Sequence, residues 1–334
     1  MHLRYEDIQG HDRVIDSLRA AVRRQRVAHA YLFAGPEGVG KETLARTFVA
    51  GLLCHQPNEG GPCGGCGACD KIARGSHPDV LCLEPDGKFI KIEAVRKMTK
   101  MVPYKPIEGR CRAVLIPHAD RLHEAAANAL LKTLEEPSQH TIFVLTTASP
   151  QSLLDTIISR CQMIRFNRLS SEAIESILKG LEGVEEEFVQ SAIGMANGSV
   201  GRALMLANSE MVERRTSLYE RLARLSEMTE FEMLSFGEDF AREKKELATQ
   251  FGLLRSWYRD VLVAQTGAQS DMLTNRDWTD ALKAHGKGLE ARKILECLRL
   301  IDEVESSLRV NVNARLAGER LFLGLFQSVC EGRN

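Results

Sequence analysis

One glycine-rich segment limits what this chain can fold into more than any other feature. The apolar run Tyr31–Ala34 leads directly into Gly35-Pro36-Glu37-Gly38-Val39-Gly40-Lys41-Glu42-Thr43, and a helical pattern follows. A strand, a glycine loop and a helix in this order are the setting of a phosphate-binding loop. The glycines let backbone N–H groups face the phosphates, the helix N-terminus adds a partial positive charge, and Lys41 would reach the β- and γ-phosphates. The residues expected to bind nucleotide are Gly35, Gly38, Gly40, Lys41 and Thr43. The alternative is a glycine turn that binds no nucleotide.

The first half of the chain alternates short β-branched runs with helical patterns, as parallel α/β folds do. The expected strands are Tyr31–Ala34, Val80–Leu83, Ala113–Ile116, Thr141–Thr146 and Gln162–Phe166. Their mostly apolar character predicts a five-stranded parallel sheet that is covered on both faces. Helical spacing of apolar residues predicts helices over Asp12–Arg26 and Arg121–Glu136, the second of which ends at Pro137.

The second half of the chain carries helical patterns only. A helix is expected to start at Ser170, and two more fill residues 184–208 around the turn Asn197-Gly198-Ser199. Residues 210–334 predict four or five longer amphipathic helices with breaks near 267–270 and 286–288. We therefore expect three domains over residues 1–166, 167–208 and 209–334.

The overall charge excludes a strong field for binding nucleic acid. The 44 Lys and Arg residues nearly balance the 45 Asp and Glu residues, which leaves a net charge of −1. Any DNA contact is therefore expected to be local or shared with partner chains. No apolar run approaches the roughly 18 residues of a membrane span, and the N-terminus lacks the apolar core of a signal peptide. We expect a cytoplasmic protein with no membrane partner.

Two positions that should hold Mg²⁺ in a phosphate-loop ATPase carry the wrong side chains. The residue after the loop Lys should be Ser or Thr, but it is Glu42, and Thr43 comes one place too late. The later strand ends in Pro117 and His118, where acidic residues are expected, and Asp120 stands too far along the turn. These two departures predict a site that can bind ATP or ADP but does not hydrolyse ATP.

Four cysteines have the spacing of a metal site. Cys54, Cys63, Cys66 and Cys69 are interleaved with glycines that supply tight turns, and a cytoplasmic setting favours thiols or metal ligands over disulfides. Four thiolates complete the tetrahedral shell of one Zn²⁺ and leave no open position, which predicts a structural site. His55 and His77 are nearby rival ligands. The alternative is four unligated thiols in a surface loop.

Motifs along almost the whole chain share one resemblance. They are Gln9-Gly10-His11, Arg26–Phe33, the four-cysteine spacing, Ala125–Pro137, Phe143–Thr147, Ser159-Arg160-Cys161, Gly198–Leu204 and Asn311–Leu316. Together they resemble the AAA+ clamp-loader subunits of bacterial DNA polymerase III. The departures at Glu42, Pro117 and His118 are more similar to the delta-prime type of subunit than to the ATP-hydrolysing motor subunits.

The resemblance implies a fold, partners and roles for two arginines. It implies an AAA+ nucleotide-fold domain over residues 1–166 with a zinc-binding insert at 54–69, a helical lid over 167–208, and a C-terminal helical collar over 209–334. Arg160 would be an arginine finger that reaches the ATP of a neighbouring subunit, and Arg202 would face this chain's own nucleotide. The implied partners are the motor and delta-type subunits of a hetero-pentamer, the sliding clamp, and primer-template DNA bound through the assembled complex.

The resemblance also implies a function, against which two rivals stand. The implied function is that of a non-catalytic subunit that helps to load the sliding clamp onto primed DNA during replication. One rival is an active motor subunit of the same complex, in which Thr43 and another carboxylate rebuild the Mg²⁺ site. The other is a free-standing zinc-containing nucleic-acid-binding protein. Without the resemblance, Arg160 and Arg202 would be expected to be ordinary surface arginines.

Overall fold

The computed structural model groups the chain into two compact units. It describes residues 3–181, 184, 186–207, 209–242, 247–267, 272–308 and 312–331. The N-terminal unit comprises residues 1–177 and 198–201, and the helical unit comprises residues 178–197 and 202–334. Each unit is described by itself below. The three-domain division at residues 166 and 208 stays a prediction.

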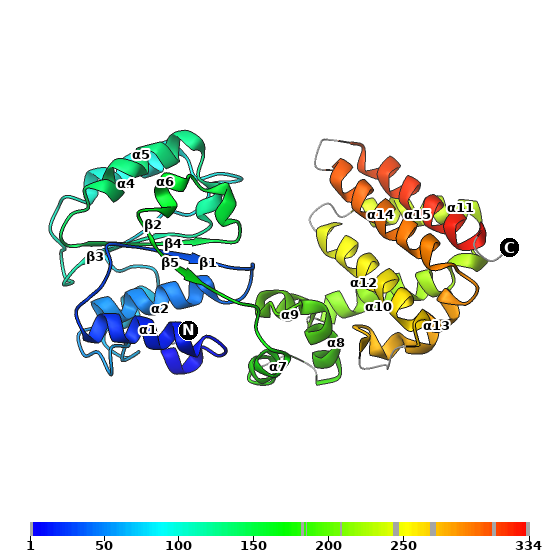
Figure 1. Cartoon of the computed structure of the whole chain (residues 1–334), viewed down its shortest axis with the longest axis horizontal. Coiled ribbons are helices and arrows are strands. Elements are labelled where there is room, and N and C mark those ends of the chain that lie inside the picture. The colour runs from blue at the N-terminus through cyan, green and yellow to red at the C-terminus, as the bar shows by residue number, and fades with distance from the viewer. Residues whose placement is uncertain are drawn as a thin grey trace. The chain divides into compact units, whose positions relative to one another are not determined.

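A five-stranded parallel sheet forms the centre of the N-terminal unit (Figure 1). Its strands are β1 (Ala30–Ala34), β2 (Val80–Cys82), β3 (Arg112–Ile116), β4 (Thr141–Thr147) and β5 (Gln162–Arg165). They lie in the order β2-β3-β4-β1-β5, and every neighbouring pair is parallel. The predicted α/β fold with five parallel strands is confirmed, and each strand differs from its expected bounds by one residue at one end.

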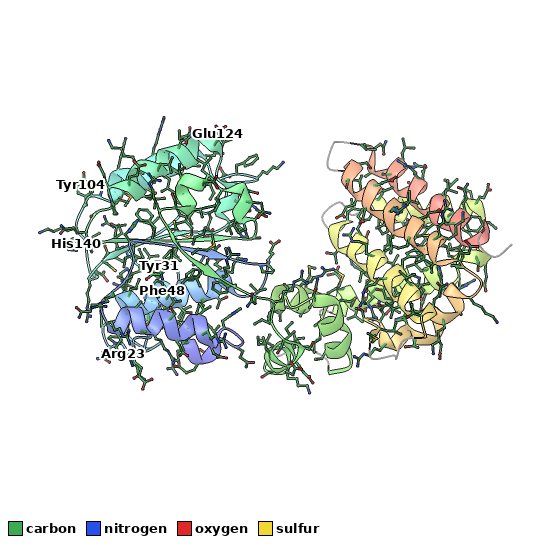
Figure 2. All side chains as sticks on the ribbon, in the orientation of Figure 1. Arg23, Tyr31, Phe48, Tyr104, Glu124 and His140 are labelled. Atoms are coloured by element: carbon green, nitrogen blue, oxygen red, sulfur yellow. The ribbon has the colours of Figure 1, made fainter. Side chains whose placement is uncertain are left out.

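Helices cover both faces of this sheet because successive strand residues point to opposite sides. Tyr31 and Phe33 of β1 pack in a core with α1 and α2, whereas Ala30 and Leu32 pack in a second core with α4, α5 and α6. The Tyr31 and Phe48 rings meet edge to face at 5.1 Å between the sheet and α2 (Figure 2). The helices of this unit are α1 (Asp12–Arg23), α2 (Lys41–Leu53), α3 (Gly67–Ala73), α4 (Ile92–Met101), α5 (Glu124–Glu135) and α6 (Asp155–Ile158).

Two expected helices are shorter than their sequence patterns. The first ends at Arg23, because Arg24 caps it and Gln25 adopts a positive φ of 54°. The second begins at Glu124 and not at Arg121, because residues 119–121 form a short 3₁₀ helix. The extended segment after it pairs with Ile90, whose N–H donates to the Arg121 carbonyl at 2.8 Å. Tertiary pairing therefore overrides the local helical pattern at this position.

The helical start predicted at Ser170 is confirmed. The Ala173 N–H donates to Ser170 Oγ at 3.2 Å, and α7 follows over Ser171–Lys179, which spans the boundary between the units. Two helices, α8 (Glu186–Ala196) and α9 (Val200–Leu206), flank the expected turn, in which Asn197 and Gly198 both have positive φ.

Six helices follow from residue 209 in the described part of the chain, where the sequence predicted four or five. They are α10 (Ser209–Ala223), α11 (Glu230–Arg242), α12 (Leu247–Gln265), α13 (Thr279–Gly286), α14 (Ala291–Leu308) and α15 (Ala314–Glu331). Their core contains Tyr219, Trp257, Tyr258 and Phe322, all fully buried. The expected break at 286–288 is confirmed, whereas residues 268–270 of the other break lie outside the described residues. None of the described helices is long and apolar enough to cross a membrane.

Candidate nucleotide site and candidate metal centre

The glycine loop turns sharply between β1 and α2. Gly38 and Gly40 have φ values of +72° and +96°, a region that side chains disfavour. A Cβ on Gly38 would overlap Ser199 Oγ, and a Cβ on Gly35 would overlap the Phe166 carbonyl oxygen. The Gly38 carbonyl accepts a hydrogen bond from Gly201 N–H at 2.9 Å. Glycine is therefore needed at position 35 because the Phe166 backbone approaches closely, at position 38 because of Ser199 and the positive φ, and at position 40 because of the positive φ alone.

The Lys41 side chain lies inside this loop. Its Nζ donates to the carbonyl oxygens of Gly35 at 2.8 Å and Pro36 at 2.6 Å, and the residue is only 8% exposed. Burial lowers the pKa of Lys41, while the negative charges of Glu37 and Asp120 oppose that shift. The ammonium group is thus held where the loop curls, by two backbone carbonyl oxygens of the same loop.

The Glu42 carboxylate turns along α2 and away from the loop. Its Oε1 accepts hydrogen bonds from Arg46 Nη2 at 2.8 Å and Arg46 Nε at 3.0 Å, one helical turn further on. Arg46 also pairs with Glu84 at 3.3 Å. Thr43 lies in the first turn of α2, where its carbonyl accepts from Thr47 Oγ1 at 2.9 Å. The position that would hold a metal-binding hydroxyl therefore carries a carboxylate engaged with arginine.

The sequence did not predict the contacts of Asp120. Its Oδ1 accepts from Thr147 Oγ1 at 2.7 Å and from Ala148 N–H at 3.3 Å, at the carboxyl end of β4. The preceding His118 has a positive φ of 52° and donates its N–H to Thr146 Oγ1 at 3.3 Å. The expectation that Asp120 stands too far along the turn to hold Mg²⁺ stays a prediction, and at this edge of the sheet its negative charge raises the pKa of Lys41. Only the neighbouring positions of β3 and β4 in the sheet, which the sequence does not specify, bring it there.

His11 is a second residue that was not among the predicted site residues. It is buried, its Nε2 donates to the Val39 carbonyl at 2.7 Å, and its ring meets Phe166 edge to face at 4.9 Å. The side chain therefore ties the segment before α1 to the glycine loop. The Gln9-Gly10-His11 motif was its only signal in the sequence.

Arg160 lies just beyond α6 with its side chain about one-third exposed. Its Nη2 donates to Glu135 Oε1 at 2.6 Å, and its Nη1 donates to the Thr156 carbonyl at 2.9 Å. These two partners hold the guanidinium at the surface of the N-terminal unit. The finger role of Arg160 stays a prediction.

Arg202 belongs to the helical unit, on α9. Its Nη2 would lie 2.7 Å from a Cβ at Gly252, so a larger residue on α12 would displace it. Partial burial, and next the positive charge of Arg255, lower the pKa of Arg202. Its role toward nucleotide likewise stays a prediction.

The four predicted cysteines converge. Their Sγ atoms all lie within 4.8 Å of one another, and Cys54 Sγ is 3.8 Å from Cys66 Sγ. Four sulfurs at about 2.3 Å from one Zn²⁺ in a tetrahedron would be separated by about 3.8 Å. Cys54 ends α2, and Cys66 and Cys69 lie at the start of and within α3. The described cluster comprises these four residues without His55 or His77.

Backbone amides assist the cluster. Cys63 N–H donates to Cys54 Sγ at 3.3 Å. Burial raises the pKa values of the Cys54 and Cys69 thiols, whereas N–H groups of Cys69 and His55 and neighbouring thiols outweigh burial at Cys66 and lower its pKa to about 6. The donor set and spacing therefore fit a structural zinc ion, whose ligands must be thiolates.

Comparison with known proteins identifies the family. The model of the DNA polymerase III delta subunit matches residues 10–170, and that of its C-terminal region matches residues 209–325. The chain is 33% identical to the DNA polymerase III subunit delta′ of Bacillus subtilis over 318 residues, which cover 94% of this chain and 95% of that protein.

Two further relatives match over shorter stretches. The chain is 37% identical to the delta′ subunit of Pseudomonas aeruginosa over 205 residues, 60% of this chain and 62% of that protein. It is 34% identical to the tau subunit of Bacillus subtilis over 208 residues, 61% of this chain and 37% of that protein. The likeness to the Bacillus subtilis delta′ subunit runs almost end to end in both proteins, and the chain therefore belongs to the delta′ family of DNA polymerase III clamp-loader subunits.

Proposed function

We propose that this chain is a clamp-loader subunit that binds nucleotide without hydrolysing it. The observation that carries the proposal is the engagement of Glu42 with Arg46 at the position where a hydroxyl should bind Mg²⁺. Pro117 and His118 add a second departure at the end of β3, because neither can replace a metal-binding carboxylate. Gly35, Gly38, Gly40, Lys41 and Thr43 would still contact the phosphates, and Arg202 would face the same nucleotide.

The same proposal gives the cysteine cluster a structural role. One Zn²⁺ on Cys54, Cys63, Cys66 and Cys69 would tie the end of α2 to the start of α3. Four protein ligands leave no position for substrate, so the ion would supply folding energy to the insert and no chemistry.

Arg160 would act on a neighbouring subunit. An arginine presents a planar, permanently charged fork that suits the oxygens of a transferring phosphoryl group. Its surface position just beyond α6 supports this role, as does the fact that Glu135 is its one carboxylate partner among the described residues. The partners in this proposal are the motor and delta-type subunits, the sliding clamp and primed DNA, all in the cytoplasm.

The test of the finger is the variant Arg160→Ala in a reconstituted clamp loader. Fingers supplied in trans accelerate GTPases by about 10³–10⁵-fold, but here one of several ATP sites would lose its finger, so the total rate should fall by less. We expect intact folding, zinc content and assembly, together with impaired clamp loading and DNA-stimulated ATP hydrolysis. Arg160→Lys, which keeps the charge but loses the fork, should not restore full activity. A variant that assembles and loads clamps at the wild-type rate would contradict the assignment.

One observation favours the rival motor function. Asp120 lies at the sheet edge and its charge acts on Lys41, so Thr43 and Asp120 are the residues that could rebuild a metal site. The isolated chain decides between the two functions. We expect no ATP turnover above background, whereas steady-state turnover that disappears in Lys41→Ala would establish the motor.

A further inference from the structure

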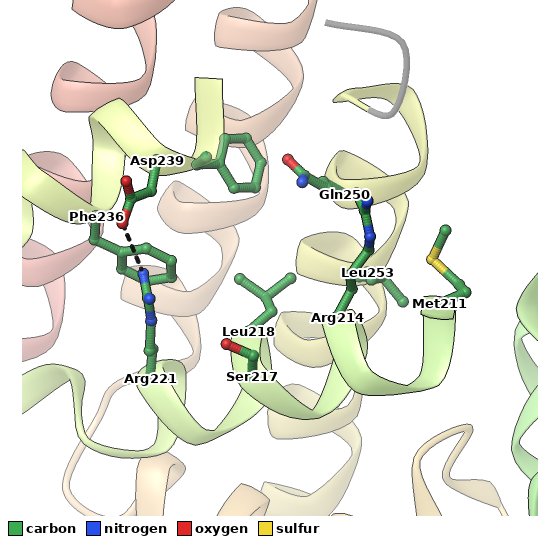
Figure 3. Close-up of a pocket in the computed structure, with 10 residues that line it drawn as sticks. Met211, Arg214, Ser217, Leu218, Arg221, Phe236, Asp239, Gln250 and Leu253 are labelled. Atoms are coloured by element: carbon green, nitrogen blue, oxygen red, sulfur yellow. Dashed lines mark ion pairs between the residues drawn. The ribbon is translucent and has the colours of Figure 1, made fainter. Parts of the chain in front are cut away.

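The helical unit contains a pocket that neither the nucleotide site nor the zinc centre uses. It lies between α10, α11 and α12 and has a volume of about 290 Å³ (Figure 3). Half of its ten lining residues are apolar: Met211, Leu218, Phe236, Phe240 and Leu253. The other half are polar: Arg214, Ser217, Arg221, Asp239 and Gln250. All ten belong to the helical unit, so its own fold shapes the pocket.

One face of α10 gives the pocket its positive charge. Met211, Arg214, Leu218 and Arg221 follow one another at spacings of three and four residues, so they share one side of this helix. A helix face that packs against two neighbouring helices is ordinarily apolar along its whole length. Arg214 donates to Glu210 Oε1 at 2.8 Å, one turn earlier on the same helix, so the guanidinium of Arg221 is the group on this face that an anionic ligand would meet.

Arg221 is placed to receive that group. Its guanidinium lies over the Phe236 ring, with Cζ 4.8 Å from the ring centroid. It pairs with Asp239 at 3.6 Å, which is beyond hydrogen-bond range, and it donates no hydrogen bond to any described residue. Phe236 is itself fixed by stacking on Phe322 at 4.0 Å. An arginine placed over an anchored ring can keep its N–H groups available for bidentate binding of a carboxylate.

The opposite side of the pocket offers an acceptor. Gln250 projects from α12 toward the space that Arg214 and Leu218 border (Figure 3). Its Oε1 is buried and has no hydrogen-bond partner among the described residues. Leaving such an atom unpaired costs about 1–3 kcal/mol, so a ligand that donates an N–H here would gain stability.

We propose that this pocket binds a segment of a partner protein in which a carboxylate stands beside an apolar side chain. The carboxylate would bind Arg221, the apolar side chain would pack on Met211, Leu218 and Leu253, and a backbone N–H of the segment would donate to Gln250 Oε1. Nucleic acid fits less well, because phosphates and sugars would leave the five apolar side chains of the pocket without apolar partners. The inference does not depend on the nucleotide chemistry proposed above.

The experiment selects ligands from a displayed library of random linear peptides with the full-length chain as target. Enriched peptides should carry Asp or Glu next to Phe, Leu, Ile or Met. One synthetic enriched peptide is then titrated by fluorescence anisotropy, next to its Asp→Asn or Glu→Gln form, which should bind about tenfold more weakly or worse. Absence of enrichment, or equal binding of the two forms, would overturn the proposal.

Four variants of the chain locate the binding. Arg221→Gln should weaken the peptide about tenfold or more, while Arg224→Gln, a neighbouring exposed arginine that does not line the pocket, should leave it unchanged. Ser217→Trp, at an exposed position, should block the pocket. Asp239→Asn should tighten binding, because it removes the carboxylate that competes for Arg221. Peptide binding that is unchanged in both Arg221→Gln and Ser217→Trp would refute this assignment. So would a single-stranded oligonucleotide that abolishes peptide binding by occupying the same pocket.

Discussion

The side chain of Glu42 is the first of the two departures on which we base the proposal of nucleotide binding without metal use. Its carboxylate is engaged with Arg46 and offers no hydroxyl to Mg²⁺. We therefore expect the affinity for ADP to change by less than about twofold between excess Mg²⁺ and excess chelator. Titration of a fluorescent ADP analogue measures this, and Lys41→Ala should weaken binding equally in both conditions. If Mg²⁺ instead lowered the Kd for ADP by about tenfold or more, Thr43 and Asp120 would be binding the metal.

The buried carboxylate of Asp79 is expected to hold the loop at residues 107–109 in place. It accepts N–H groups of Ile107, Glu108 and Gly109 at 2.6, 2.8 and 2.8 Å, and it pairs with Arg112 at 3.7 Å. Burial alone would raise the pKa of Asp79, but these three hydrogen bonds hold it below its usual value. Its stabilisation is therefore present above the unfolded pKa of about 3.9 and is lost as the pH falls through the lower folded pKa.

Hydrogen exchange tests this prediction directly. In Asp79→Asn the three amides should exchange about ten- to hundredfold faster at neutral pH, which corresponds to a loss of about 1–3 kcal/mol. In the wild-type chain their protection should persist at pH 5 and disappear only below about pH 4. Unchanged protection in the variant would mean that the loop is held by other contacts.

Site residues could be predicted from the sequence where the residues that act together lie close together along the chain. The four cysteines lie within sixteen positions, so their spacing alone predicts a cluster. Asp120 and His11 act through contacts with Thr147 and Val39, which lie 27 and 28 positions away. Such contacts depend on strand order and on the path of the chain, and no local pattern encodes them.

The insert that carries α3 is expected to stay folded only while it binds zinc. Fresh protein should contain one zinc per chain by elemental analysis, and a chelator should disorder residues 54–73 while the two sheet cores remain folded. Cys66→Ser should lose zinc, whereas Cys82→Ser, which changes an exposed cysteine outside the cluster, should keep it. Protein purified without chelators that contains well under one zinc per chain would contradict the cluster's role.

Strands were predicted more accurately than helix ends for a physical reason. A strand buried on both faces must be apolar along its length, so the first and last apolar residues of the run predict where the strand begins and ends. The start of α5 depends instead on the hydrogen bond between Ile90 N–H and the Arg121 carbonyl, which removes residues 121–123 from the helical pattern. Similarly, α13 is only eight residues long, too short for a clear amphipathic pattern, which is why six helices were counted as four or five.

At the scale of the whole molecule, the two units have separate cores and distinct spectroscopic reporters. The chain contains two tryptophans, Trp257 and Trp278, and both lie in the helical unit with ring centroids 6.1 Å apart. Trp257 is fully buried against Tyr219 and His285. Tryptophan fluorescence therefore reports on the helical unit alone, whereas far-ultraviolet circular dichroism reports on both units.

This difference makes the independence of the units measurable in the intact chain. Units with separate cores need not unfold in one two-state transition, so the urea transitions followed by fluorescence and by circular dichroism should not coincide. Removal of zinc acts on the N-terminal unit, and it should shift the transition seen by circular dichroism to lower urea while leaving the tryptophan transition in place. Cys66→Ser should reproduce the shift, and Cys82→Ser should not. If the two probes instead gave one coincident transition that moved as a whole when zinc was removed, the two units would be stabilising each other and the chain would unfold as a single cooperative body.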